Sequence, residues 1–353
     1  MYPINPLIKM ANNIRFREID SLRGLAVLLM VMVHAAATWN PSNTSQTSTL
    51  AYIVAGLGGL AAPLFVTIFG WGMYKSKSPR KAILIKAGIL LILQYIVNLC
   101  SPQLYDPFSP GILSLFAILL IARPVIIKAI DSFNNILIFS GLIITMFIIN
   151  NSLLEFQGSN NWDARITVND VLHLINLALF TGTYPLFPWI SFCVVGAFLG
   201  RFVTEGGKTL PRNNTIASLI IVGISYCIVT LYLAVVNSKV WAHPSRGDYL
   251  NFFPANLGFM IAAVTGVLIL WLIVQELNFL LFEQAGKVSL TVYVAHFIPL
   301  TYLSDLEDKG NWTIMEASQA VILFTTTWLL FAYFCNRYQW LTIEHLIGKL
   351  TVR

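Results

Sequence analysis

Long apolar stretches separated by short polar segments are the dominant pattern of this chain. About 20 apolar residues let a helix cross a bilayer, so each stretch near this length predicts a transmembrane helix. Ten stretches qualify: Leu22–Thr38, Leu50–Tyr74, Ala82–Leu99, Gly111–Ile127, Ile136–Leu154, Tyr184–Phe202, Ile216–Val236, Ala255–Val274, Val288–Leu303 and Ala317–Phe334. The pattern predicts an all-α integral membrane protein with about ten transmembrane helices in one bundle. A further apolar segment, Val168–Thr181, is too short for a full span, and we expect an interfacial or re-entrant helix there.

The positions of Lys and Arg predict the orientation of these helices. Cytoplasmic loops of membrane proteins carry an excess of both residues. If the N-terminus is cytoplasmic and all ten stretches cross, 18 of the 22 Lys and Arg residues lie inside, and only Arg165, Lys239, Arg246 and Lys309 lie outside. We therefore expect both termini in the cytoplasm, as segments 1–21 and 337–353. Without a repeat or a long linker, residues 1–353 form one multi-pass domain.

Composition supports a membrane protein and excludes several other classes. The chain is 57% hydrophobic and only 11% charged, with a mean hydropathy of +0.72, whereas soluble proteins carry about 25% charged residues. A cytosolic enzyme, a nucleic-acid binder and a disordered protein are thereby excluded, and we expect the cell membrane as the location. The net charge of +6 reflects basic cytoplasmic loops. The four cysteines have no metal-like spacing, so we expect no metal.

Two histidines lie deep inside predicted spans, where titratable side chains are costly and are functional candidates by default. His34 lies 11 residues beyond Arg23, about 16 Å along a helix, and His296 lies nine residues beyond Lys287, about 13 Å. Either histidine alone could mark a water boundary or bond to a backbone carbonyl. Their matched depth favours a functional pair, since a neutral imidazole is a ready general base.

The segment from Phe16 to His34 carries a specific pattern, Asp20-x-x-Arg23-Gly24 followed by His34, so that Arg23 and His34 are separated by ten residues. This pattern resembles the transmembrane acyltransferase superfamily, in which acyltransferase-3 proteins carry a catalytic histidine at the end of an Arg-x10-His motif. Three further segments resemble its heparan-glucosaminide N-acetyltransferase-like branch: Pro63–Ser76, Tyr184–Arg201 and Gly286–His296. That branch often has Asn where this chain has His34, and its active histidine lies in the first outer loop. The corresponding loop, Trp39–Thr49, contains no histidine here, so our assignment of His34 follows the acyltransferase-3 pattern.

The resemblance implies an acyltransferase that moves an acyl group, most simply acetyl, from cytoplasmic acetyl-CoA or another acyl-CoA to an extracytoplasmic glycan or lipid-linked sugar. We expect His34 and His296 as catalytic residues. Basic side chains near the inner face are candidates for binding the phosphates of the donor: Arg23, Arg80, Lys81, Lys86 and Arg123. Positive-inside bias or pairing of Arg23 with Asp20 explains such charges equally well.

Aromatic side chains are the candidates for binding the acceptor, because their rings can stack on a sugar. Trp39, Trp71 and Trp189 are assigned this role, with an interfacial belt or helix packing as the alternative. Expected partners are membrane lipid, the acyl-CoA and the glycan, with no nucleic acid; a homodimer is compatible with the sequence. The competing function is a secondary transporter with the histidines as a proton relay, but paired acidic residues at mid-membrane and two related halves are missing from the sequence.

Overall fold

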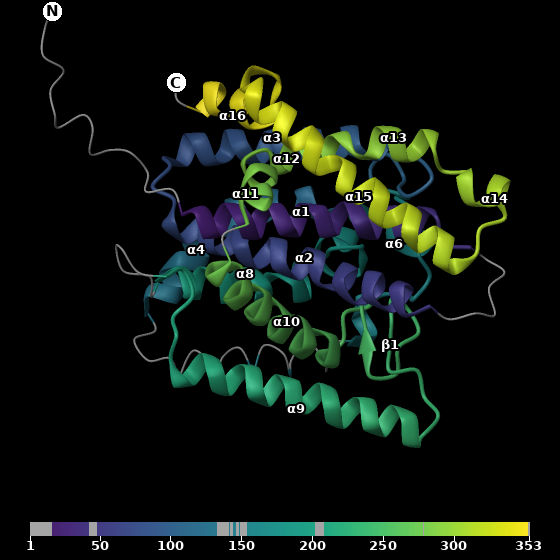
Figure 1. Cartoon of the computed structure of the whole chain (residues 1–353). Helices are drawn as coiled ribbons and strands as arrows, with labels where there is room; N and C mark the ends of the chain where they lie inside the picture. Colours follow the sequence, from purple (N-terminus) through teal and green to yellow (C-terminus); the bar gives the residue numbers. More distant parts are fainter. Residues whose placement is uncertain are drawn as a thin grey trace, which may run out of the picture.

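A computed structural model describes residues 16–41, 48–132, 154–201, 208–277 and 279–351, together with 141, 144, 145 and 148. Helices dominate the described residues, and the only sheet found among them pairs two short strands, β1 (Ala242–His243) and β2 (Leu250–Asn251), in parallel (Figure 1). The long helices are α1 (Arg17–Thr38), α2 (Thr49–Lys75), α3 (Arg80–Cys100), α4 (Ile112–Ser132), α8 (Leu186–Arg201), α9 (Asn214–Val236), α10 (Leu257–Glu276) and α15 (Ile314–Arg337). Shorter helices connect them: η2 (Leu154–Gln157), α6 (Asp163–Ile166), α7 (Val171–Asn176), η3 (Leu177–Thr181), α11 (Leu280–Lys287), α12 (Ser289–Ala295), α13 (Phe297–Tyr302), α14 (Leu306–Gly310), η4 (Gln339–Leu341) and α16 (Ile343–Thr351).

The prediction of an all-helical membrane protein is confirmed. Within the described residues, seven helices are long and apolar enough to cross a bilayer: α1, α2, α3, α4, α9, α10 and α15. The pair formed by Val171–Thr181 and Leu186–Arg201 passes the same test but is bent by 47°, which gives up to eight spans. The described helices therefore account for seven or eight of the ten predicted spans, and the number ten stays a prediction.

Two of the predicted spans need separate comment. The stretch Ile136–Leu154 lies almost wholly outside the described residues. The stretch Val288–Leu303 is not one continuous helix, because it is divided into α12 and α13 at His296 and is preceded by another break at Val288. The segment Val168–Thr181 forms α7 and η3, joined to α8 through the 47° bend, as a short re-entrant or interfacial segment would be.

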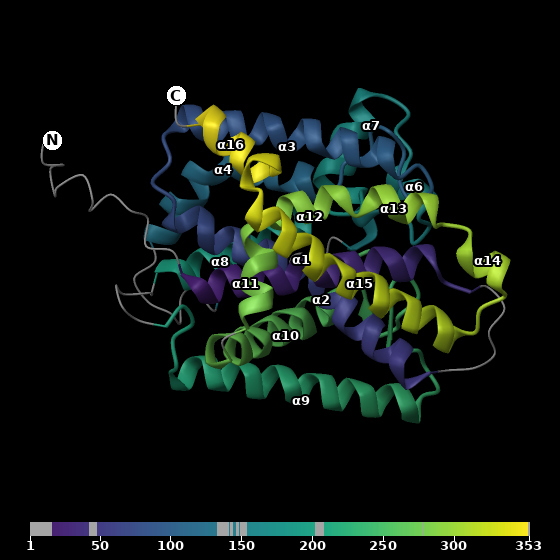
Figure 2. The same cartoon turned by 45° about the horizontal axis from the view of Figure 1, so that its top comes forward.

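Helix α1 occupies the centre of the bundle. It packs against α2, α10, α11, α12 and α15 (Figures 1 and 2). Most of its residues are buried, and its sequence is mostly apolar. A helix that is apolar on all sides suits a position surrounded by other helices. Helix α9 lies at the opposite extreme, on the outside of the bundle beside α10, and much of its apolar surface is exposed as a lipid-facing helix requires.

The contact between α1 and α11 is made by two glycines that face each other. A Cβ placed at Gly24 would collide with the carbonyl of Phe282, and one at Gly286 would collide with the carbonyl of Asp20. Small residues allow this approach of two helix backbones, which packing in a membrane favours. Gly24 belongs to the Asp20-x-x-Arg23-Gly24 pattern and Gly286 begins the Gly286–His296 segment, so the two motifs meet in space.

Helices α2 and α8 also approach each other closely through glycines. A Cβ at Gly70 would meet the backbone of Cys193, and one at Gly196 would meet the carbonyl of Thr67. Outside this contact, the first turn of α8 is distorted at Phe187, whose φ and ψ of −104° and 118° are not helical. Gly70, Gly196 and Gly200 thus lie at the contact between α2 and α8, whereas a Cβ at Gly72 would meet no atom within 4 Å.

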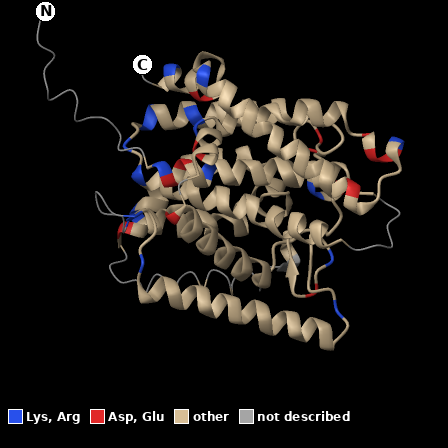
Figure 3. Cartoon of the chain, viewed as in Figure 1, with Lys and Arg blue, Asp and Glu red and all other residues tan. Residues whose placement is uncertain are grey.

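Charged side chains gather at the two ends of the bundle. Figure 3 shows Lys and Arg concentrated at the end where α1 begins and where α2 and α8 finish, while fewer lie at the opposite end. The C-terminal helix α16 lies at the basic end as well. This distribution agrees with the expected 18-to-4 division of basic residues, and the assignment of the basic end to the cytoplasm stays a prediction from the positive-inside rule.

Replacing Gly24 by alanine should destabilise the protein, because the added methyl group must displace the backbone of α11. Overpacking of this kind costs about 1–3 kcal/mol. We expect the purified Gly24→Ala protein to melt several degrees below the wild type in detergent, and to lose the α1–α11 approach.

The matched control is Gly88→Ala in α3, where the new Cβ meets no atom within 4 Å. An alanine in such an open helical position is neutral or stabilising by about 0.5–1 kcal/mol. Equal melting temperatures for the two variants would contradict the packing argument.

Candidate functional site

His34 and His296 meet at the centre of the bundle. The Nδ1 atom of His34 lies 2.9 Å from Nε2 of His296, and the two rings stack with 5.1 Å between centroids and 6° between planes. His34 is 5% exposed and His296 is fully buried. The structure therefore brings together the two histidines that sequence analysis had placed only at similar depth.

Each histidine occupies a defined position on its helix. His34 lies in the last turns of α1, and His296 lies at the junction where α12 ends and α13 begins. Gly24 precedes His34 by ten residues and Gly286 precedes His296 by ten residues, about 15 Å if both paths were helical. Because the glycines touch at one end and the histidines at the other, the two segments run in the same direction and in register.

Aromatic rings surround the histidine pair. Phe297 lies 4.0 Å from the His296 ring and 4.8 Å from the His34 ring between centroids, and Tyr293 lies within 6.1 Å of both. Trp328 of α15 approaches the His296 ring edge-on at 6.0 Å. The buried Nε1 atom of Trp328 has no hydrogen-bond partner among the described residues, so it can donate to a bound group.

Tyr105 completes the site from the loop between α3 and α4. Its hydroxyl lies 3.4 Å from Nε2 of His34. The loop is held by Asn98, whose Nδ2 donates to the carbonyls of Pro107 and Ser109, and by Trp162, whose Nε1 donates to the carbonyl of Leu104. Sequence analysis did not identify Tyr105, because no periodicity relates a loop residue to a helix 71 positions earlier.

The hydrogen-bond chain assigns the tautomer of each ring. Nδ1 of His296 lies 3.3 Å from the carbonyl of Val292, and a carbonyl can only accept, so this nitrogen carries the proton. In neutral His296 the other nitrogen, Nε2, then accepts from Nδ1 of His34. Nε2 of His34 is left with a lone pair, which accepts from the Tyr105 hydroxyl. The basic nitrogen of the pair is thus Nε2 of His34.

Tyr105 is suited to this donor role. Burial, with a smaller contribution from neighbouring Tyr184, holds the pKa of Tyr105 well above its usual range. Its hydroxyl therefore keeps its proton at neutral pH. A substrate hydroxyl or amine that replaced it at Nε2 of His34 would present a proton to the same lone pair.

Two of the candidate phosphate-binding arginines already have partners. Nη1 of Arg23 lies 3.2 Å from Oδ1 of Asp20, one turn earlier on α1, and the Arg23 side chain remains 35% exposed. Arg123 donates from Nε to the carbonyl of Met73 at 3.0 Å and from Nη2 to the carbonyl of Ser76, so it satisfies carbonyls at the end of α2. Arg123 thus has a structural use, whereas Arg23 retains an accessible face.

The three candidates on α3 lie near its first turn. Arg80 and Lys81 are exposed and Lys86 is half-buried. They lie on the basic end of the bundle, where a cytoplasmic anion would approach if the predicted orientation holds (Figure 3). The structure contains no direct evidence on what they bind.

The three candidate acceptor-binding tryptophans are all buried. Trp39 donates from Nε1 to the carbonyl of Leu303 at 2.7 Å, and Trp189 packs against Phe192 and Tyr184. Trp71 packs edge-on against Phe16. Burial on this scale favours helix packing over stacking on a sugar.

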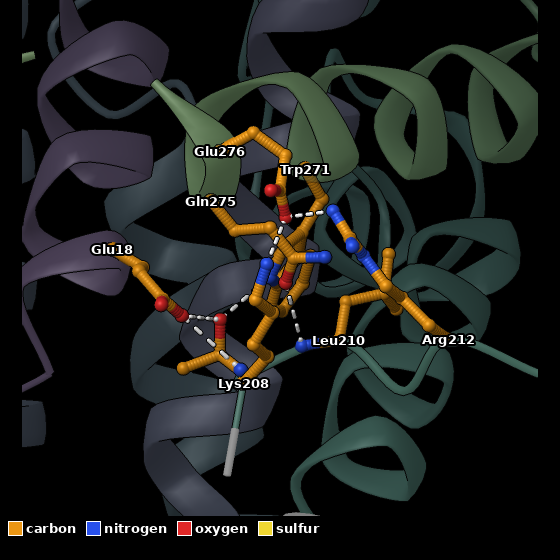
Figure 4. Close-up of polar contacts among 8 residues, drawn as sticks. Glu18, Lys208, Leu210, Arg212, Trp271, Gln275 and Glu276 are labelled. Atoms are coloured by element: carbon orange, nitrogen blue, oxygen red, sulfur yellow. Dashed lines mark hydrogen bonds and ion pairs between the residues drawn. The ribbon is translucent and has the colours of Figure 1, made fainter. Parts of the chain in front are cut away.

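A polar network fixes the loop that leads into α9. Thr209 donates from both its amide and its hydroxyl to Oε2 of Glu18 on α1, and the indole of Trp271 donates to that hydroxyl. Figure 4 shows Glu276 between Lys208 and Arg212, with which it forms ion pairs. These contacts join α1 and α10 at the basic end of the bundle. Throughout the described residues, no group of three or more His, Cys, Asp or Glu side chains could hold a metal ion.

Arg165 organises the opposite end. It is only 2% exposed, and its guanidinium donates to four backbone carbonyls, those of Gln157, Ser159, Thr181 and Gly182. Burial lowers the pKa of Arg165 to about 10, so the group is still protonated at neutral pH. Sequence analysis treated this residue only as one of four outer basic residues.

A family model described as heparan-alpha-glucosaminide N-acetyltransferase, catalytic, matches residues 15–236, more than half of the chain. The chain belongs to this family. The match confirms the resemblance inferred from the sequence motifs, and with the apolar helices it indicates a multi-pass membrane acetyltransferase. No curated protein matches the chain.

The family match covers only part of the site. Arg23, His34 and Tyr105 lie inside the matched residues, whereas His296 and the whole of α10 to α16 lie beyond them. The family match thus includes His34, whereas His296 is placed in the site by the structure alone.

Replacing Arg165 by lysine should destabilise the protein although the charge is kept. A single ammonium group cannot reach four carbonyls at once, and each buried acceptor left unpaired costs about 1–3 kcal/mol. We expect the melting temperature of Arg165→Lys to fall by several degrees, measured on purified protein.

Arg246→Lys provides the control, because Arg246 is an exposed arginine in the loop between β1 and β2. It should melt like the wild type. If Arg165→Lys also melts normally, the carbonyl contacts of Arg165 contribute little to stability.

Proposed function

We propose that this protein is a membrane-embedded acetyltransferase that moves an acetyl group from cytoplasmic acyl-CoA to a glycan or lipid-linked sugar on the other side of the membrane, with His34 as general base. The observation that carries the proposal is the buried contact between His34 and His296. Each histidine ends a motif that resembles the acyltransferase superfamily, and the family match independently supports acetyl transfer.

The chemistry follows from the lone pair on Nε2 of His34, which the acceptor would meet in place of the Tyr105 hydroxyl. The acceptor hydroxyl or amine gives its proton to this nitrogen while its oxygen or nitrogen forms a bond to the thioester carbon. The carbon–sulfur bond then breaks, and the leaving thiolate takes the proton back from the imidazolium. The products are the acetylated acceptor and free coenzyme A, and His34 ends in its starting state. We assign the buried Nε1–H of Trp328 as the donor for the developing oxyanion.

His296 is assigned a positioning role. Its bond to Val292 fixes its own tautomer, which makes Nε2 an acceptor and keeps the proton of His34 on Nδ1. His296 therefore holds Nε2 of His34 in the basic form without meeting the acceptor itself. This division differs from our sequence-based expectation that both histidines are catalytic.

The donor is proposed to bind at the basic end of the bundle. Arg23, Arg80, Lys81 and Lys86 are the groups we assign to its phosphates, with Arg123 set aside because it already satisfies carbonyls at the end of α2. Arg23 lies on the same helix as His34, 11 residues or about 16 Å away. An extended thioester arm could therefore follow α1 from the phosphates to the base.

A secondary transporter was the competing function. The family match supports the enzyme instead, because its description names a catalytic domain. The closed chain from Tyr105 to Val292 also supports it: the chain ends on a backbone carbonyl, which cannot pass a proton on.

His34→Ala should lower acetyl transfer by about 10²–10⁴-fold, the usual cost of removing a positioned base. His296→Ala should cost less, because His34 keeps its ring and loses only the group that fixes its tautomer. Transfer of radiolabelled acetyl from acetyl-CoA to membrane glycans would measure both effects.

His243→Ala is the matched control, since His243 is exposed on the short strand β1 and should leave transfer unchanged. If His34→Ala keeps near-wild-type turnover while His296→Ala is inactive, the two roles are exchanged. If both variants remain active, another group supplies the base.

Arg23→Ala should weaken binding of acyl-CoA by about tenfold, because one charge-assisted hydrogen bond to phosphate is worth about 1.5–3 kcal/mol and Arg23 is partly solvated. The shift in melting temperature on adding coenzyme A measures affinity, since a ligand that binds only the native state stabilises it. The dependence of affinity on salt should also fall.

Arg246→Ala controls for net charge, because Arg246 is exposed in the loop between β1 and β2, and Figure 1 shows β1 away from the start of α1. Unchanged affinity and salt dependence in folded Arg23→Ala would leave Arg23 as the partner of Asp20 alone.

A further inference from the structure

The helix that carries His296 begins at a break. Helix α11 ends at Lys287, and Val288 separates it from α12 with φ and ψ of −125° and 29°. The first amide groups of any helix lack partners within the helix and need an acceptor from outside. Val288, at the N-cap position, has no side-chain acceptor to offer, and no side-chain cap forms there.

Glu344 of α16 supplies the missing acceptor. Its Oε1 accepts from the amide of Leu290 at 2.7 Å and from the amide of Thr291 at 3.2 Å. Its Oε2 accepts from the hydroxyl of Thr291 at 2.5 Å. A carboxylate at the N-terminus of a helix also interacts favourably with the partial positive charge there.

A further hydrogen bond runs in the opposite direction, from the backbone of α16 to α12. The amide of Ile343, the first residue of α16, donates to the hydroxyl of Thr291 at 2.9 Å. The hydroxyl of Thr342 accepts from the amide of His345, which starts α16 in the direction that brings Glu344 to α12. The starts of the two helices are therefore bound to each other by four hydrogen bonds.

His296 lies at the other end of the same short helix. Its amide donates to the carbonyl of Val292, and Val292 donates to the carbonyl of Val288 at the break. Only five residues, or about 7.5 Å of helix, separate Thr291 from His296. A shift at the start of α12 is therefore transmitted to the histidine ring and to its contact with His34.

We propose that Glu344 is a positioning residue for acetyl transfer, which holds α12, and through it His296, against His34. The C-terminal helix α16 then acts on the histidine pair through α12, from the basic end of the bundle. This inference rests on the proposed role of the histidine pair.

The test compares Glu344→Ala, Glu344→Gln and the control Lys349→Ala on the full-length protein in detergent. Lys349 is an exposed charged residue on the same helix. Hydrogen–deuterium exchange of the Ser289–His296 peptide reports the cap directly, and steady-state kinetics report the histidine pair. Loss of a helix cap of about 1 kcal/mol corresponds to roughly fivefold faster exchange.

In Glu344→Ala we expect exchange in this peptide to rise at least about fivefold and kcat to fall by about 10²-fold, the cost of a misplaced catalytic group, with KM for acetyl-CoA unchanged. Glu344→Gln keeps an oxygen that can accept from both amides and should recover most of each loss. Lys349→Ala should match the wild type in both measurements.

Unchanged exchange in Glu344→Ala would overturn the capping role. Faster exchange with unchanged kcat, in a protein whose His34→Ala and His296→Ala variants are inactive, would overturn the coupling to catalysis. If the histidine variants are active, the proposed function has failed, while the exchange data still decide whether Glu344 caps α12.

Discussion

The contact between Gly24 and Gly286 is the constraint on which the site depends. Two helix backbones can approach this closely only where neither residue has a Cβ, and the contact fixes both the distance and the register of α1 and α11. From that point the chain advances ten residues along each segment and arrives at His34 and His296. The close contact at one end of the two parallel segments therefore positions the two histidines at the other end.

The sequence could predict this much because helices have a fixed rise. Counting from Arg23 and Lys287 gave His34 and His296 similar depths without any knowledge of which helices touch. Gly24 and Gly286 belong to the motifs quoted in the sequence analysis, but their role in packing is seen only where the structure brings them together. What the count could not supply was the partner of each glycine, because helix–helix contacts between distant segments leave no periodic signal.

Breaks in membrane helices were the main failure of the sequence-based prediction. The stretch Val288–Leu303 is predominantly apolar and was assigned as one span, yet it forms α12 and α13 after a break at Val288. Broken backbone at membrane depth is tolerated where its polar groups find partners inside the protein. Here the partner is a carboxylate from Glu344, over 50 residues later, which a hydropathy pattern does not connect with the break.

The proton arrangement of the site is set by the contacts of His296 with Val292 and His34. The carbonyl of Val292 accepts from the amide of His296 and also lies 3.3 Å from Nδ1 of the His296 ring. That acceptor decides the tautomer of His296, which decides the tautomer of His34, which leaves the lone pair on Nε2 facing Tyr105. The position of His296 four residues after Val292 therefore determines, through the two nitrogens of its own ring, which nitrogen of His34 is basic.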